Sequence, residues 1–140
     1  MFGIFESSKN KDIKKHFRIA VWNALAESGS SAGTPDDRPL VQLADKLVTD
    51  WLRSLPKHVV NNVSASSLAA YVLVAETQTL MTSSKTAGMA NFYISAAKML
   101  VAGFGLRSHT LHDDEFKLLV IMAKLAKTNE LDFYPELTSM

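Results

Sequence analysis

The residues best able to do chemistry lie together in residues 107 to 116, RSHTLHDDEF. On a helix that begins within this stretch, His112 would share a face with Glu115, and His109 would lie just outside it and approach Asp113. Imidazole nitrogens and carboxylate oxygens are ligands that suit zinc, manganese or iron. His109, His112 and Asp113 are therefore a candidate site for a divalent metal. The alternative function that follows is a metal-dependent hydrolase, with Glu115 as acid or base.

The same stretch is also typical of the start of a helix. Thr110 or Asp113 can cap the amide groups of the first turn, and the acids from Asp113 to Glu115 complement the positive end of the helix dipole. The helix start therefore explains the presence of these three acidic residues without a bound metal. We therefore prefer the helix start, assign no catalytic residue and predict no cofactor apart from the metal alternative.

The other motif matches fail because their context is helical. Residues 29 to 33, GSSAG, fit Gly-x-Ser-x-Gly, but a nucleophile elbow needs a strand before the serine. Residues 103 to 108, GFGLRS, begin like a dinucleotide fingerprint but lack its third glycine and follow a helical pattern. The sequence has no Glu-x-x-His pair, no His-Glu-x-x-His and no Walker loop. Because it also has no cysteine, a non-enzymatic protein is favoured.

Length and composition predict one globular domain over residues 1–140. The chain is 47% hydrophobic and 21% charged, and 140 residues suffice for a continuous core. Charges such as Lys98 interrupt its apolar runs, so none reaches the ~20 residues of a membrane-spanning helix. Near residue 1 the apolar residues precede the lysines, which is the reverse of a secretory signal. A cytoplasmic protein that is not integral to a membrane is expected.

Hydrophobic periodicity predicts an all-α bundle of about five helices, and no segment shows sustained strand alternation. The predicted helices span about residues 11–28, 39–55, 65–82, 86–102 and 113–128. Gly29 is a natural stop for the first helix, and Pro56 ends the second.

Three further segments complete the predicted domain. Residues 29–38 form a linker loop, and Thr34 and Asp37 within it have the spacing of a helix cap. Residues 1–10 are a segment that is either flexible or tucked onto the bundle, and residues 130–140 are a tail beyond the last helix.

The last three predicted helices should form the apolar centre of the bundle. Between residues 58 and 107 only four residues are formally charged, too few to cover a solvated face. They are Glu76, Lys85, Lys98 and Arg107. If the third and fourth helices form an antiparallel hairpin, Glu76 lies level with about Tyr93, so a contact of Glu76 with Tyr93 or Lys98 is predicted.

The predicted helices carry more apolar surface than one small bundle can easily bury. The residues that we expect in an exposed groove or interface are Tyr71, Met89, Phe92, Tyr93, Met99 and Phe104. Such a surface predicts a homo-oligomer, a homodimer above all, or a groove for a helical protein partner. The function favoured by the sequence is therefore a non-enzymatic intracellular binding or assembly module.

A basic line on the first predicted helix is a candidate anion-binding site. Lys11, Lys15 and Arg18 share one face and could contact phosphates or anionic lipids. A formal net charge of only +1 makes nucleic acid an unlikely partner. Because the apolar stretch MFGIF, residues 1 to 5, directly precedes these lysines, peripheral membrane association is a further alternative function.

Overall fold

The computed structural model describes residues 7–27, 29, 33–81, 90–100, 114, 117–118, 120–122 and 124. The helices with described bounds are α1 (Ser8–Glu27), α2 (Arg38–Leu52), α3 (Lys57–Asn62), α4 (Ala65–Met81) and α5 (Ala90–Leu100). The described residues from 114 to 124 are also helical, and no strand occurs in the part of the chain that is described. The predicted all-α bundle is confirmed. None of the helices described is long and apolar enough to cross a membrane.

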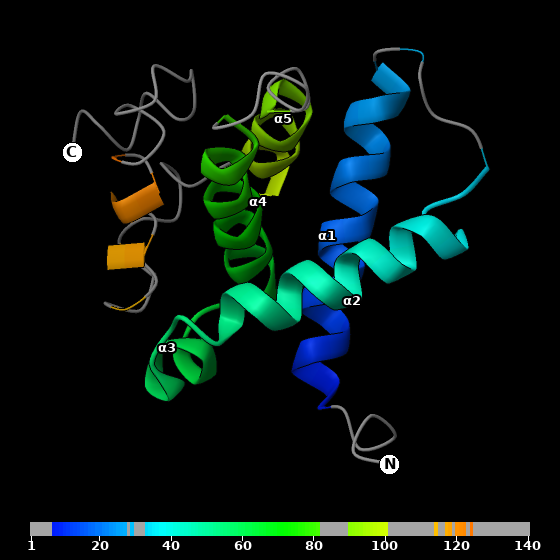
Figure 1. Ribbon diagram of the computed structural model, residues 1–140. Helices are drawn as coiled ribbons and strands as arrows, with labels where there is room; N and C mark the ends of the chain where they lie inside the picture. The colour runs from blue at the N-terminus through cyan, green and yellow to red at the C-terminus, as the bar shows by residue number, and fades with distance from the viewer. Residues whose placement is uncertain are drawn as a thin grey trace.

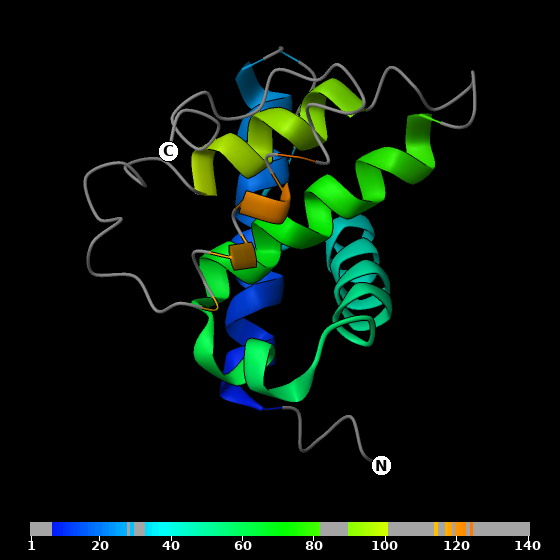
Figure 2. The ribbon, with the colours of Figure 1, turned by 90° about the vertical axis from the view of Figure 1, so that its left-hand side faces the viewer.

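The helices pack around α4. The most extensive pairing joins α4 and α5, which run in opposite directions (Figure 2). α1 lies against both of them, and α2 crosses in contact with α1 and α4 (Figure 1). The antiparallel pair α4 and α5 is thus enclosed by helices that precede it in the chain.

α4 lies at the centre of the core, as predicted from its lack of charge. Every residue from Ser67 to Ala70 and from Val72 to Ala75 is buried. Its buried polar groups have partners within the helix or at its start: the Thr77 hydroxyl donates to the Leu73 carbonyl at 2.7 Å, and Ser67 bonds to Ser64. α4 therefore offers neighbours an apolar surface on nearly every side.

The first and last predicted helices complete this core. α1 contributes five buried residues at the three- and four-residue spacing of one helix face. They are Ile13, Phe17, Ala20, Val21 and Ala24. Leu118 and Met122, from the last predicted helix, are buried in the same cluster. The predicted centre is confirmed, and α1 belongs to it because its apolar face packs against both α4 and α5.

Two glycines with positive φ shape the connection from α1 to α2. α1 ends at Glu27, and Gly29 has φ 77° and donates its amide to the Ala26 carbonyl at 3.0 Å, which confirms the predicted stop. Gly33 has φ 74°, and a Cβ atom at this position would overlap the Asp37 carboxylate. Gly33 is thus constrained twice, by its backbone and by its neighbour.

The Asp37 carboxylate closes the turn that leads into α2. It accepts from the Thr34 amide at 3.1 Å and from the Thr34 hydroxyl at 3.3 Å, so the two residues bond to each other, but the predicted helix cap is not formed. Asp37 is also the N-cap residue of α2, but its side chain makes no cap hydrogen bond there. The carboxylate is engaged by Thr34 instead, so the pair stabilises the turn rather than the helix end.

The connection from α2 to α4 contains a short helix that the sequence analysis did not predict. α2 ends at Leu52, three residues before the predicted end, and Pro56 is the N-cap of α3. Six residues are too few to display a hydrophobic period, which is why α3 escaped prediction. Ser64 follows it and accepts the Ser67 amide at 3.3 Å, as expected of a cap at the start of α4.

We expect Phe17→Ala to destabilise the fold by about 3–5 kcal/mol, because truncating a buried aromatic ring leaves a cavity. Phe17 is 0% exposed and meets the Tyr93 ring edge to face. Ile19→Ala on the same helix is the matched control, since Ile19 is 38% exposed. Urea denaturation of both variants measures the difference; equal losses would contradict the packing of α1 described above.

We expect Gly33→Ala to cost more stability than Gly29→Ala. Both substitutions put a side chain at positive φ, at about 1–2 kcal/mol each. Only Gly33 lies against Asp37, and displacing that carboxylate also loses its bonds to Thr34, for roughly 1 kcal/mol more. Thermal and urea unfolding of the two variants provide the test. A Gly33→Ala variant as stable as Gly29→Ala would show that Asp37 is not held against the glycine.

Candidate functional site

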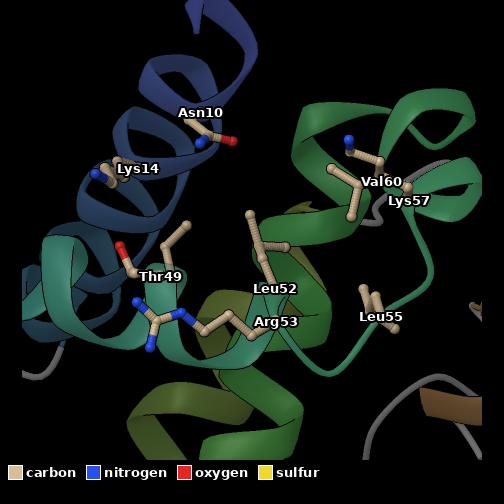
Figure 3. Close-up of a pocket in the computed structure, with 9 residues that line it drawn as sticks. Asn10, Lys14, Thr49, Leu52, Arg53, Leu55, Lys57 and Val60 are labelled. Atoms are coloured by element: carbon tan, nitrogen blue, oxygen red, sulfur yellow. The ribbon is translucent and has the colours of Figure 1, made fainter. Parts of the chain in front are cut away.

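A pocket of about 290 Å³ lies between α1, the end of α2 and α3 (Figure 3). The residues that line it are Asn10, Lys14, Val48, Thr49, Leu52, Arg53, Leu55, Lys57 and Val60. Its volume is near the lower limit of the ~300–1,000 Å³ typical of small-molecule sites. The pocket is therefore suited to a small ligand or to one group of a larger ligand.

The bend after α2 creates this pocket. Once α2 ends at Leu52, the Ser54 and Leu55 amides bond to the Trp51 and Leu52 carbonyls, both at 3.1 Å. The Ser54 hydroxyl donates to the same Trp51 carbonyl at 2.6 Å and lies 2.9 Å from the Tyr71 hydroxyl of α4. Pro56 then starts α3, so residues on both sides of the bend face one space.

The short helix α3 is also tied to its surroundings on two sides. The Lys9 ammonium of α1 donates to the Asn61 carbonyl at 3.1 Å. The Asn62 amide group donates to the Asp114 carboxylate at 3.2 Å. These contacts join α3, which carries Lys57 and Val60 of the pocket lining, to α1 and to Asp114.

The pocket has an apolar floor. Val48 is buried, and Leu52, Leu55 and Val60 are partly buried members of the hydrophobic core. Figure 3 shows Leu52 projecting from the end of α2 into the space between α1 and α3. A ligand that reaches this floor would remove further apolar surface from water.

The rim of the pocket is cationic. The Lys14 ammonium lies 3.4 Å from the Asp45 carboxylate, so this charge is partly compensated. Arg53 and Lys57 are exposed and form no ion pair with any other described residue. In Figure 3 the Arg53 guanidinium lies on the side of Thr49 and Lys14, and Lys57 lies beside Val60. The arrangement favours an anion held above an apolar surface.

Behind the pocket, α2 is joined to α4 by a partly buried polar contact. The Trp51 indole donates to the Glu76 carboxylate at 2.8 Å. Burial raises the pKa of Tyr93 to about 12, and the nearby charge of Glu76 adds to the rise. The charge of Glu76 thus acts on Tyr93, whereas the described hydrogen bond of Glu76 is to Trp51, so the predicted contact of Glu76 with Tyr93 or Lys98 stays a prediction.

The predicted basic line lies on α1, and one of its three residues is paired within the fold. Lys11 and Lys15 are exposed. The Arg18 guanidinium lies 3.3 Å from the Asp36 carboxylate in the turn before α2, so it is engaged within the fold. Anion binding by this set of three remains a prediction. The sequence analysis did not predict the cationic rim formed by Lys14, Arg53 and Lys57. These residues line one pocket only because the chain bends after α2. The one hint in the sequence was the presence of Arg53 and Lys57 close to Pro56 on either side.

The predicted metal site lies outside the described residues, since His109, His112 and Asp113 are not among them. Within the described part of the chain, no three His, Asp or Glu side chains are placed to hold one metal ion. The neighbouring Asp114 carboxylate accepts from Asn62 of α3. The metal site therefore stays a prediction.

Of the six residues predicted to form an apolar groove or interface, the structure describes the side chains of two, Tyr71 and Tyr93. Tyr93 is 3% exposed and packs on Phe17, so it contributes to the core. Tyr71 is partly buried, with its hydroxyl beside Ser54. The other four lie outside the described residues or have side chains outside the description: Met89, Phe92, Met99 and Phe104. A groove formed by the whole set stays a prediction.

Comparison with protein-family models, curated proteins and solved structures finds no match for this chain. Its function is therefore argued from the pocket and its surroundings.

We expect the fold to lose about 2–3 kcal/mol of stability between pH ~10 and ~12 through Tyr93 alone. An unfolded tyrosine ionises near pH 10.0, whereas the folded protein holds the Tyr93 proton up to about 12. The unfolded state thus binds fewer protons in this window, and stability falls as the pH rises. Tyr93→Phe removes this component, so urea unfolding across the window should show a shallower alkaline loss.

Glu76→Gln is the matched control for this experiment. It removes the charge near Tyr93 but keeps an oxygen that can accept from the Trp51 indole. Because burial is the larger cause of the raised pKa, the alkaline loss should shrink in this variant but persist. Parallel alkaline losses in wild type and Tyr93→Phe would refute the raised pKa.

Proposed function

We propose that the protein is a non-catalytic binding module whose ligand is a small amphiphilic anion. The observation that carries this proposal is the pocket after α2, where Arg53 and Lys57 stand at the rim of a floor formed by Val48, Leu52 and Val60. The two cations alone do not distinguish this site, because exposed lysines elsewhere on the protein attract an anion equally well. The apolar floor adds affinity only for an anion that carries a hydrocarbon part.

The groups around the pocket support binding rather than catalysis. Acid–base catalysis needs a group that can take or give a proton near neutral pH, most often histidine, aspartate or glutamate. None of the described residues that line the pocket is of these types. Thr49 and Asn10 supply a hydroxyl and an amide, which can orient an anion by hydrogen bonds.

A cytoplasmic homodimer, or an assembly with a helical protein, is a further proposal that comes from the sequence. For the assembly, the described surface offers one supporting feature. Val120 and Ile121 lie in a hollow between Lys117 and Lys124, and Ile121 is 49% exposed. Apolar surface of this kind gains from being covered by a partner.

We expect the protein to bind octyl phosphate more tightly than octyl glucoside, which has the same tail and no charge. Arg53→Ala with Lys57→Ala should weaken octyl phosphate binding by roughly 1–2 kcal/mol, a value that allows for solvent screening at exposed sites. Isothermal titration calorimetry below the micelle-forming concentration measures both ligands. The glucoside affinity should change little in this double variant.

The matched control is the double variant Arg38→Ala with Lys46→Ala. It removes the same two residue types from exposed positions of α2 that do not line the pocket. Urea unfolding verifies that both double variants remain folded. Equal affinity for the two octyl ligands, or equal weakening by the two double variants, would refute the proposed site.

A further inference from the structure

We propose that the anion taken by this pocket is the phosphate headgroup of a membrane lipid, so that the end of the molecule around α3 rests on an anionic bilayer. The inference rests on the proposed function and names the source of the amphiphilic anion. It is carried by the position of the pocket relative to the start of α1, and by the charges gathered there.

The start of α1 and the pocket lie at the same end of the molecule. In Figures 1 and 2 the first turns of α1 lie at the same end of the molecule as α3. The Lys9 ammonium bonds to the Asn61 carbonyl of α3, and Asn10, in the next position, lines the pocket. The start of α1 therefore lies next to the pocket.

Positive charge is concentrated at this end. In the nine residues of α1 before Phe17 there are four lysines and one acid, Asp12. Arg53 and Lys57 add two further cations across the pocket. The other acids near this end are Asp45, which pairs with Lys14, the exposed Asp50, and Asp114, which accepts from Asn62 of α3. The six cations thus outnumber the four acids, and the excess of positive charge attracts an anionic surface.

The apolar floor of the pocket favours a lipid over a water-soluble phosphate. In the sequence, the apolar residues Phe2, Ile4 and Phe5 precede the lysines of α1, and apolar insertion reinforces the attraction between lysines and anionic lipids. The pocket floor can accept the glycerol and first acyl carbons that lie next to a lipid phosphate. At about 290 Å³ the pocket suits a headgroup, with the acyl chains left in the bilayer.

Vesicle flotation of the full chain tests the inference. We expect binding to vesicles of phosphatidylcholine that contain phosphatidic acid, and no binding to phosphatidylcholine alone. Binding should weaken as salt is added, because Arg53 and Lys57 are exposed. Arg53→Ala with Lys57→Ala should lower the vesicle partition constant roughly thirtyfold, since each cation near an anionic bilayer contributes about fivefold.

Two further variants separate the pocket from general surface charge. Arg38→Ala with Lys46→Ala removes the same charge outside the pocket and should lower partitioning much less. Thr49→Glu leaves every cation in place but adds a carboxylate to the pocket lining, so it should also weaken binding strongly. Equal effects of the two double variants, or an inert Thr49→Glu, would overturn the inference.

The soluble probes distinguish this inference from the proposed function on which it rests. If octyl phosphate binds in the pocket but vesicles with phosphatidic acid do not, the lipid inference fails and the binding module stands. If a soluble phosphoserine peptide binds more tightly than such vesicles, a protein partner replaces the lipid. If neither octyl phosphate nor vesicles bind, both proposals fall.

Discussion

The architecture depends on the need to cover α4 on all sides. This helix carries one charged residue, Glu76, in its 17 residues and buries side chains in almost every direction. A helix without a polar face is stable in water only when neighbours enclose it. α1, α2 and α5 do so. The only charged group of α4 lies where α2 meets it and accepts the Trp51 indole at 2.8 Å, so the enclosing helix also satisfies the charge.

The pocket follows from the way in which α2 contributes to this enclosure. α2 crosses both α1 and α4, and its buried residues Ala44, Leu47 and Val48 fix that crossing. Trp51, one turn beyond Val48, joins α2 to α4, and the Ser54 hydroxyl lies beside that of Tyr71. With its end held in this way, the chain must bend within a few residues to start α3. The pocket lies between this bend and α1, and core residues form its floor.

The sequence predicts the long helices well because their hydrophobic periodicity extends over many residues and because specific residue types end them. Gly29 ends α1 at a positive φ, and the antiparallel arrangement of α4 and α5 lets the charge of Glu76 act on Tyr93. The bend after α2 could not be predicted with the same success. Pro56 indicates that a helix ends nearby, but the end at Leu52 depends on hydrogen bonds and packing that only the folded chain supplies.

The difference between local and tertiary structure also explains why the sequence predicted the basic line on α1 but not the pocket. Lys11, Lys15 and Arg18 share a face through local helix geometry, which sequence spacing determines. Lys14 approaches Arg53 and Lys57 only through the tertiary contact of α1 with the bend, 39 residues later in the chain at Arg53.

The chemistry of the pocket residues also limits how they can act. Arg53 and Lys57 are solvated, and exposed charges alone bind anions weakly because water screens them. Affinity therefore has to come from the combination of these charges with the adjacent apolar floor. The proposed amphiphilic anion satisfies both components, because it carries its charge next to hydrocarbon.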